Sequence, residues 1–223
     1  MNSGLQIAID GPAASGKSTI AQAIAQKLDA TYINTGEMYR SLTQCCMTEG
    51  IDPENETSKI VERLDAIDVS YKEVEGKSVL TCCNQVVDRA SIRTPEITSK
   101  VSIVAKIPEV RKWMVERQRD SADVGLLVME GRDIGTVVFP NAKWKFFLTA
   151  SPEERARRRL AQDGEIPSGA DLASVAKAIA ERDEMDRNRK ISPLKPADDA
   201  IMVDTTGLEI EQVLEKILSY VQI

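Results

Sequence analysis

Short apolar runs along this chain alternate with longer segments in which apolar residues recur every third or fourth position. The apolar runs predict buried strands at residues 5–9, 32–33, 125–129, 144–148 and 200–203. The three-to-four spacing predicts helices at residues 17–28, 35–49, 57–66, 95–105, 108–121, 171–188 and 209–221, and a further helix that begins at Pro152. Strands that alternate with helices are typical of a parallel sheet covered by helices on both faces. We therefore predict an α/β fold that forms a single domain over residues 1–223.

The stretch at residues 69–87 departs from this alternation. It is rich in β-branched residues, its apolar and polar positions alternate, and turn residues occur at 75–77 and at 84–85. This pattern predicts a small antiparallel sheet of two or three strands, inserted between helices. Residues 164–170 are expected to form a loop.

The composition excludes several kinds of function. The chain carries 29 Lys and Arg against 35 Asp and Glu, a formal charge of −6, which argues against a dedicated nucleic-acid-binding protein. It contains no histidine, which excludes Ser-His-Asp and Cys-His catalysis, histidine-ligated zinc and an imidazole general base. The longest apolar runs are about six residues, too short to cross a membrane. We expect neither a nucleic acid nor a membrane as partner.

The four cysteines form two vicinal doublets, Cys45-Cys46 and Cys82-Cys83. Neither doublet has the C-x-x-C spacing, so zinc and thioredoxin-type sites are weakly indicated, and neighbouring cysteines rarely pair with each other. Asp10 interrupts the first apolar stretch, so no secretory signal is indicated. We expect buried, reduced thiols in a cytoplasmic protein.

A complete phosphate-binding motif, G-x-x-x-x-G-K-S, occupies residues 11–18. It follows the first predicted strand and leads into the first predicted helix, which is the structural context the motif requires. Small residues allow backbone N–H groups to surround a phosphate, and the helix N-terminus adds partial positive charge. Lys17 would reach the β- and γ-phosphates, and the Ser18 hydroxyl can ligate Mg²⁺. The motif therefore predicts binding of a nucleoside triphosphate.

Arginines elsewhere in the chain indicate a negatively charged acceptor. Arg132 and Asp133 follow the predicted strand 125–129, at the edge of the sheet where open α/β folds bind ligands. The helical spacing of Arg182, Asp186 and Arg189 places them on one face. Further candidates are Arg40, Arg155, Arg158 and Arg159. The alternative is that these arginines are solvated surface charges, or that residues 181–189 form an exposed helix with internal salt bridges.

Five motifs together resemble the bacterial cytidylate kinases. They are I-D-G-P at 9–12, N-T-G-E-M-Y-R at 34–40, S-I-R-T at 91–94, G-R-D-I-G-T-V-V-F-P at 131–140 and E-R-D-E-M-D-R-N-R at 181–189. The resemblance runs in order over nearly the whole chain, and the motif at 131–140 is the most specific. It implies a P-loop kinase with a short helical lid at about 153–170 and a β-rich monophosphate-binding insert at about 67–93. It also implies transfer of the γ-phosphate of ATP to CMP or dCMP, giving ADP and CDP or dCDP, with Mg²⁺.

The resemblance also implies a role for each matching residue. The ATP-binding residues would be Gly11, Pro12, Ala13, Ala14, Ser15, Gly16, Lys17, Ser18 and Thr19. The acceptor phosphate would contact Thr35, Arg40 and Arg132, and the sugar would contact Arg182 and Asp186. The residues expected to read cytosine are Ser102, Arg111, Asp133 and Arg189. The catalytic charges would be Lys17, Arg132 and the lid arginines Arg155, Arg158 and Arg159.

Two positions depart from the usual residues of this family. Asn34 stands where the family usually has Asp, and Glu130 where it often has Asp. Asn34 removes a charge. Glu130 keeps the charge on a longer side chain, so a water-mediated contact with Mg²⁺ beside Ser18 is expected there.

The chemistry of the reaction agrees with this composition. A nucleoside monophosphate is already a dianionic nucleophile near neutral pH, so its attack needs no histidine as general base, and catalysis consists of positioning and charge stabilisation. Two alternatives stay open at this point. One is another small-molecule P-loop kinase, acting on a different monophosphate or on a shikimate-like acceptor. The other is a nucleotide-dependent regulatory protein that hydrolyses its ligand slowly. We expect a monomer.

Overall fold

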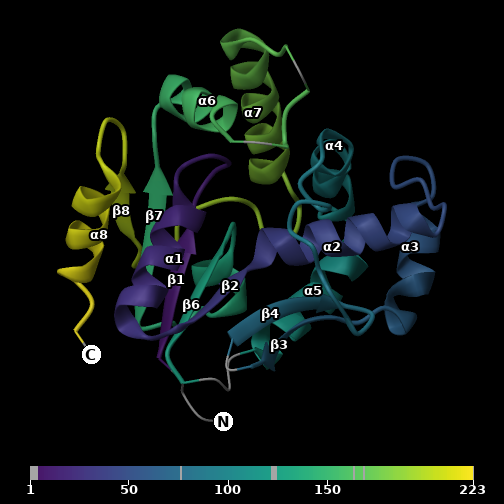
Figure 1. Ribbon diagram of the computed structural model, residues 1–223, viewed down its shortest axis with the longest axis horizontal. Coiled ribbons are helices and arrows are strands. Elements are labelled where there is room, and N and C mark those ends of the chain that lie inside the picture. The colour runs from purple at the N-terminus through teal and green to yellow at the C-terminus, as the bar shows by residue number, and fades with distance from the viewer. Residues whose placement is uncertain (1–4, 76, 122–124, 163, 168, 223) are drawn as a thin grey trace. The chain divides into compact units, whose positions relative to one another are not determined.

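The computed structural model describes residues 5–75, 77–121, 125–162, 164–167 and 169–222 (Figure 1). The chain divides into two compact units. The first unit contains residues 1–34, 122–162 and 169–223, and the second contains residues 35–121 and 163–168. The second unit therefore combines one long continuous stretch with a short segment from the region predicted to form a lid.

The first unit contains a five-stranded parallel sheet in the order β2-β6-β1-β7-β8. Its strands are β1 Gln6–Asp10, β2 Thr31–Asn34, β6 Leu127–Gly131, β7 Trp144–Thr149 and β8 Ile201–Asp204. The predicted parallel sheet is confirmed. Strand β6 lies two residues later than predicted, because Glu130 and Gly131 pair with Ile9 and Asp10 of β1 and so remain in the ladder despite ending the apolar run.

In the described residues of the first unit, the α-helices are α1 Lys17–Leu28, α6 Pro152–Leu160, α7 Leu172–Arg187 and α8 Ile210–Leu218. Helices α1 and α8 cover one face of the sheet, where their apolar residues form a core with Ile7, Ile9 and Phe146. Helices α6 and α7 lie side by side (Figure 1). Each begins at a capping side chain that accepts a backbone N–H of its first turn, Ser151 for α6 and Asp171 for α7.

One element of the first unit was not predicted. A single π-helical turn, η2 Ile134–Val138, follows β6. Its defining hydrogen bond runs from the N–H of Phe139 to the carbonyl of Ile134, 2.7 Å away. The first two amides of the turn are held by the carboxylate of Asp10, which lies on β1. A partner so distant in the sequence leaves no local signal.

The second unit contains helices around a small sheet. Its helices are α2 Thr35–Thr48, α3 Thr57–Arg63 with the 3₁₀ turn η1 Leu64–Ala66, α4 Pro95–Val104 and α5 Pro108–Asp120. Its strands β3 Val69–Val74, β4 Lys77–Cys82 and β5 Gln85–Val86 form an antiparallel sheet in the order β3-β4-β5. The predicted antiparallel insert is confirmed with three strands. Its second turn is centred on Cys83 and Asn84, both with positive φ, one residue earlier than predicted.

Parts of several predicted segments fall outside the described residues. These are Gly76 in the first predicted turn and Asp163 and Ser168 in the predicted lid and its loop. In the described part of the chain, no helix is long and apolar enough to cross a lipid bilayer.

Candidate active site

The phosphate-binding loop joins β1 to α1 in the first unit, as its motif predicts. Gly11 has a φ of 149°, and a Cβ atom at this position would lie 2.0 Å from the carbonyl oxygen of Leu148 on β7. Only glycine fits such a close approach of two backbones. Gly16 has a φ of 90° at the residue before α1, where no side chain caps the helix. The first-turn N–H groups of α1 are thus left for another acceptor.

Lys17 lies buried at the start of α1, with 5% of its surface exposed. Its Nζ donates to the carbonyl oxygen of Pro12 at 2.6 Å and to Ser15 Oγ at 3.3 Å. Burial, and then the positive charges of Arg132 and Arg155, hold the pKa of Lys17 well below its usual range. An anion placed among these three cations would offset the repulsion between them. The loop therefore presents concentrated positive charge, as a polyphosphate site requires.

Helices α6 and α7 hold the loop in place through Arg155 and Asp183. Arg155 Nε donates to the carbonyl oxygen of Ala13 at 2.7 Å, and its guanidinium forms a buried ion pair with Asp183. Asp183 Oδ1 in turn accepts the backbone N–H of Ala13 at 3.3 Å. Arg155 thus lies at the phosphate loop itself. Asp183 was missed as a site residue, although it lies three residues from Asp186 and so on a neighbouring part of the same helix face.

The other two arginines predicted for the lid lie on α6. Arg158 donates to the side chain and the carbonyl oxygen of Thr205, at 2.8 and 2.7 Å, and it also pairs with Glu154. Thr205 Oγ1 donates to the carbonyl oxygen of Ser15 in the phosphate loop. Arg158 is therefore linked to the loop through Thr205, a residue that no sequence motif indicated. Arg159 is half-buried on the same helix.

Asp10 connects the phosphate loop to the segment that carries Arg132 and Asp133. Its two carboxylate oxygens accept the N–H groups of Ile134 and Gly135 at 2.8 and 2.7 Å. Burial raises the pKa of Asp10 to about 7, against the effect of these two amides. Asp133 is buried at the residue before η2, and its negative charge contributes to raising the pKa of Asp10. Asp10 was also missed, although its place at the carboxyl end of β1 marks it as a candidate.

A cluster of arginines surrounds Asp186. Arg132 Nε lies 3.0 Å from Asp186 Oδ2, and Arg189 donates to Asp186 Oδ1. Burial alone would raise the pKa of Asp186, but the charges of Arg132, Arg189 and Arg182 lower it below its usual value. Arg182 and Asp186 both lie on α7 as predicted, but this helix ends at Arg187, so Arg189 contacts Asp186 from the segment that follows the helix. The fold adds Arg132 from a position 54 residues earlier. Three guanidinium groups therefore lie close enough to this one carboxylate to stabilise its charged form.

Glu130, at the end of β6, belongs to a hydrogen-bond chain that explains the departure at position 34. Asn34 Nδ2 donates to Tyr32 Oη at 3.2 Å, and Tyr32 Oη donates to Glu130 Oε1 at 2.7 Å. An aspartate at position 34 has no proton for Tyr32 when ionised, whereas the amide of Asn34 has. Glu130 also lies close enough to Lys17 to raise its pKa. The residues at 34 and 130 are thus linked through Tyr32.

In the second unit, Arg40 on α2 lies in a buried pocket of polar groups. Its guanidinium donates to the carbonyl oxygen of Ile92 at 3.1 Å and to Thr98 Oγ1 at 2.8 Å. It also forms an ion pair of 2.8 Å with Glu165, and both side chains are 7% exposed. Glu165 was not singled out from the sequence. Its carboxylate is paired with the Arg40 guanidinium, which we expect to contact the acceptor phosphate.

A second acid on α2 extends this network. Glu37 is buried and pairs with Arg93 at 2.7 Å and with Arg89 at 3.3 Å. Arg93 also lies 3.9 Å from Glu165. Arg93 stands in the S-I-R-T motif, which was quoted for the resemblance but given no role. The fold thus places the motifs at 34–40 and 91–94 together in one cluster of charged groups.

The remaining predicted residues of the second unit are also buried. Thr35 is the first residue of α2, and Ser102 lies on α4. Arg111 on α5 is 2% exposed, and its guanidinium lies over the ring of Tyr39 at 5.7 Å. A buried arginine needs partners, and Arg111 also donates to the carbonyl oxygen of Ala105 at 3.3 Å. These positions agree with a polar binding surface within this unit.

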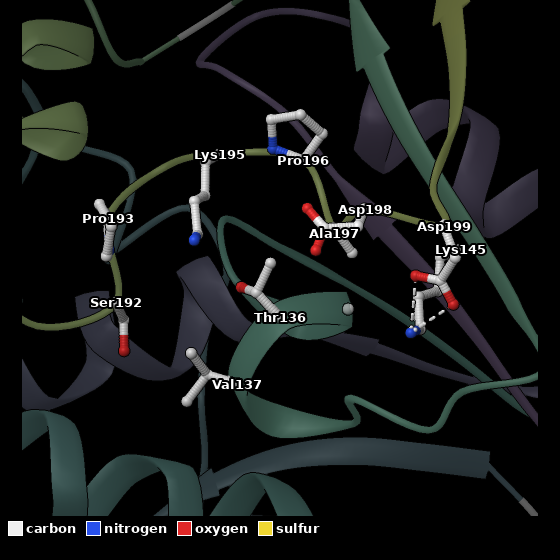
Figure 2. Close-up of a pocket in the computed structure, with 11 residues that line it drawn as sticks. Thr136, Val137, Lys145, Ser192, Pro193, Lys195, Pro196, Ala197, Asp198 and Asp199 are labelled. Carbon is white, nitrogen blue, oxygen red and sulfur yellow. Dashed lines mark hydrogen bonds and ion pairs between the residues drawn. The ribbon is translucent and has the colours of Figure 1, made fainter.

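A cavity of about 450 Å³ lies in the first unit, between η2 and residues 192–199 (Figure 2). One of its charged groups, the Lys145 ammonium, is paired with Asp199 and with the carbonyl oxygen of Pro140. None of the predicted site residues lines this cavity. It is therefore not part of the cluster of phosphate-binding groups.

Comparisons with known proteins agree with this geometry. The family model described as cytidylate kinase matches residues 7–223. Curated cytidylate kinases from Bacillus cereus and Bacillus thuringiensis are each 45% identical to this chain over 221 residues, which cover 99% of this chain and 97% of theirs. A solved structure of an uncharacterized protein from Eubacterium ventriosum shares the fold, with a TM-score of 0.53 at 10% identity and 97% coverage of both chains. With a family model that spans nearly the whole chain and relatives at 45% identity, this chain belongs to the cytidylate kinase family.

Proposed function

We propose that this chain transfers the γ-phosphate of ATP to CMP or dCMP, with ADP and CDP or dCDP as products. Its family membership supports this reaction over the two alternatives, another small-molecule P-loop kinase and a slowly hydrolysing regulatory protein. The observation that carries the proposal is the convergence of Lys17, Arg132 and Arg155 at the phosphate loop, next to the arginines around Asp186. Such a charge distribution suits two polyanionic substrates.

On the ATP side, the backbone of residues 11–19 surrounds the triphosphate. Lys17 turns from the carbonyl of Pro12 to the phosphate oxygens, on which negative charge grows during transfer. Arg155 and Asp183 hold the loop in its conformation, Arg155 through the carbonyl oxygen of Ala13 and Asp183 through the N–H of the same residue. Arg132 and the α6 arginines Arg158 and Arg159 stabilise the transferring group.

On the acceptor side, the roles are those that the resemblance to the family implies. Arg132, Thr35 and Arg40 contact the CMP phosphate, and Arg182 and Asp186 hold the sugar. The residues that read cytosine are Ser102, Arg111, Asp133 and Arg189. The phosphate of CMP replaces the carboxylate of Glu165 on Arg40, since both are anions of suitable size for a guanidinium.

The chain acts by positioning its substrates and by excluding water. The reaction needs no general base. The CMP phosphate attacks as a dianion, so no proton has to be removed from the nucleophile. Both substrates are polyanions and repel each other, and water that would screen this repulsion is excluded. The arginines offset the repulsion instead. We propose that residues 153–170 form the lid and residues 67–93 the insert of a single kinase domain, and that the lid excludes water while both substrates are bound.

The residues near the loop fit a magnesium ion carried by ATP. The Ser18 hydroxyl, in the first turn of α1, and the Glu130 carboxylate, through a water molecule, are hard oxygen donors of the kind Mg²⁺ prefers. Bound there, the ion would neutralise charge on the β- and γ-phosphates. Tyr32 and Asn34 keep the Glu130 carboxylate oriented.

The reaction is tested by measuring ADP release with CMP, dCMP, UMP and AMP as acceptors. The proposal predicts turnover with CMP and dCMP that greatly exceeds turnover with UMP and AMP. Equal ADP release with and without an acceptor would contradict it and favour a hydrolysing regulatory protein. We further propose that the chain acts as a monomer in the cytoplasm. Light scattering of the purified protein tests the oligomeric state.

Arg182→Ala and Asp186→Ala are expected to weaken the use of CMP more than the use of ATP. Loss of a hydrogen bond to a charged group corresponds to roughly 10- to 100-fold in KM for CMP. Asp186→Ala should also lower the Tm, because it leaves Arg132 and Arg189 without their shared carboxylate. KM values for the two substrates, measured separately, test this prediction. Arg187→Ala, on the exposed side of the same helix, is the control, and equal changes in all three variants would contradict the prediction.

Tyr32→Phe is expected to raise the Mg²⁺ concentration that gives half-maximal rate by about 10-fold, the scale of one hydrogen bond to a charged group. The change removes the hydroxyl that joins Asn34 to Glu130, and it leaves the ring in place. The rate is measured against Mg²⁺ at saturating ATP and CMP. Tyr220→Phe, whose ring lies edge-on to Phe146 at the surface, is the matched control. A lowered Tm with an unchanged Mg²⁺ dependence would mean that the chain of hydrogen bonds is only structural.

A further inference from the structure

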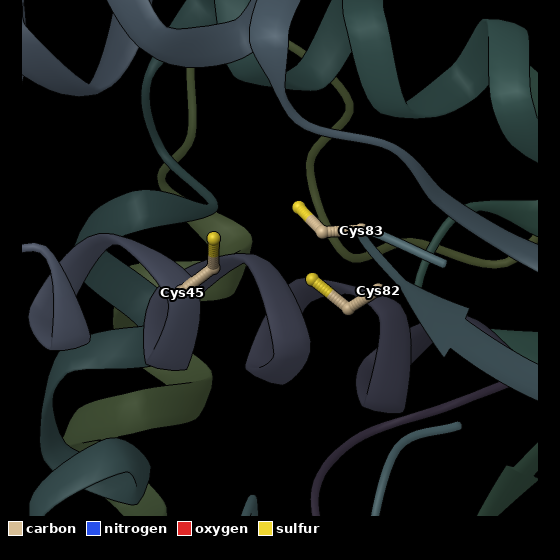
Figure 3. A group of neighbouring side chains, drawn as sticks. All are labelled: Cys45, Cys82 and Cys83. Atoms are coloured by element: carbon tan, nitrogen blue, oxygen red, sulfur yellow. The ribbon is translucent and has the colours of Figure 1, made fainter. Parts of the chain in front are cut away.

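Three of the four cysteines, which are distant in the sequence, meet in the second unit. Cys45 lies on α2, Cys82 ends β4, and Cys83 begins the turn to β5. Their three sulfur atoms all lie within 4.8 Å of one another. Figure 3 shows the sulfurs of Cys82 and Cys83 directed toward the side of α2 that carries Cys45. Cys45 and Cys82 are half-buried and Cys83 is exposed, so the expectation of buried thiols holds only for Cys46.

The backbone at Cys83 makes this arrangement possible. In a regular strand, neighbouring side chains point to opposite faces of the sheet, so a vicinal pair would not share a partner. Cys83 has a φ of 49° and Asn84 a φ of 64°, which is the left-handed conformation. This turn departs from the alternation of the strand and brings both sulfurs to the same side. Positive φ at both residues of a two-residue hairpin loop is typical of the type I′ turn, in which Asn, Asp and Gly are usual and a cysteine is not.

The electrostatics of the cluster favour a thiolate. Hydrogen bonds from Cys82 and then Cys83 lower the pKa of Cys45 to about 7, against the effect of burial, and Arg63 lowers it further while Glu49 opposes. The hydrogen bond to Cys45 in turn raises the pKa of Cys82. Cys46 points into the core, where burial raises its pKa to about 12. Hydrogen bonds from Cys82 and Cys83 thus favour a thiolate on Cys45, whereas Cys46 does not take part.

We propose that Cys45, Cys82 and Cys83 form a binding site for one thiophilic metal ion of the zinc group, Zn²⁺ or Cd²⁺. Three thiolates bind the ion, and water fills the fourth position on the exposed side at Cys83. Sulfur ligands about 2.3 Å from zinc lie roughly 3.8 Å from each other, so the present separations need to shorten by about 1 Å at most. Rotation of the half-exposed side chains provides this change.

When the metal ion binds, it replaces the protons of the thiols, and nothing is oxidised or reduced. Each thiol that becomes a ligand loses its proton to solvent, and three thiolates with a divalent ion carry a net charge of −1. The occupied site connects α2 to the turn between β4 and β5. It therefore stabilises the second unit, whose helix α2 also carries Thr35 and Arg40.

The test is a titration of the full chain with Cd²⁺ in the presence of a phosphine reductant, followed by the ultraviolet charge-transfer absorption of cadmium thiolate. We expect one ion per wild-type chain and competition by Zn²⁺. Cys83→Ser and Cys45→Ser should each weaken binding by more than the roughly 10- to 100-fold that loss of an outer partner costs at metal sites. Cys46→Ala, the neighbouring buried thiol, is the matched control and should bind as the wild type does. Unchanged binding by Cys45→Ser would overturn the proposal, because a site made of Cys82 and Cys83 alone does not need α2.

A second measurement does not depend on absorption. Zn²⁺ at a concentration 100 times its dissociation constant should raise the Tm of the wild type, since a ligand specific for the folded state then stabilises it by about 2.7 kcal/mol. The exposed variant Cys83→Ser should fold normally, keep its kinase activity without metal, and show a much smaller increase. Equal increases in the wild type and in Cys83→Ser would overturn the proposal. The kinase reaction is not needed for either measurement.

Discussion

Lys17→Ala is expected to lower kcat by roughly 100-fold or more, the scale of losing one preorganised donor to a developing charge. The reason lies in the position of Lys17 at the start of α1, 2.6 Å from the carbonyl of Pro12 and close to Arg132 and Arg155. Its charge acts where the γ-phosphate leaves ATP, so its loss falls on the transition state more than on the bound substrates. The effect should therefore appear in kcat.

The fold should withstand this change. Burial and two neighbouring guanidinium groups already disfavour the ammonium form of Lys17, so its removal relieves repulsion in the folded protein. Circular dichroism and the Tm check the fold, and steady-state rates with ATP and CMP check the activity. Lys27→Ala, in the last turn of the same helix, is the control. A folded Lys17→Ala protein with nearly normal kcat would contradict the proposed role.

Asp133→Ala is expected to reduce kcat/KM for CMP sharply and that for UMP much less. Asp133 is buried at the junction of β6 and η2, where its carboxylate can accept a hydrogen bond from the N4 amine of cytosine. Uracil has a carbonyl oxygen at that position, so UMP would leave a buried acceptor without a donor. This mismatch corresponds to about 2–4 kcal/mol, or roughly 30- to 1,000-fold in kcat/KM. The ratio of kcat/KM for CMP to kcat/KM for UMP should fall by a similar factor.

The measurement is kcat/KM for CMP and UMP in the wild type and the variant. Asp133→Asn adds a sharper comparison, because its amide can donate to the uracil carbonyl and should improve the relative use of UMP. If Asp133 only supports the start of η2, both acceptors should lose activity equally and the Tm should fall. An unchanged CMP-to-UMP ratio would remove Asp133 from base recognition.

The order of elements and the phosphate loop were predictable from the sequence because their signals are local. The spacing of apolar residues reports which face of a helix is buried, and α1, α2, α4 and α5 begin at the predicted residues. The glycines and Lys17 of the loop lie within one turn of the chain. Helical geometry alone placed Arg182 and Asp186 on one helix, whereas Arg189 lies beyond the end of that helix. Even the motif-based family assignment rests on short contiguous segments.

Only the tertiary structure decided which of these segments meet. The sheet order β2-β6-β1-β7-β8 places β6 next to β1, and this brings Asp10 to the amides of η2 and produces a helical turn that no local pattern predicts. The packing of α6 on α7 joins Arg155 to Asp183 at the phosphate loop. The turn at Cys83 brings two vicinal thiols to Cys45 on α2. In each case the partners lie tens of residues apart, so their contact depends on strand order and helix packing. The spacing of residues along the chain indicates neither the strand order nor the helix packing.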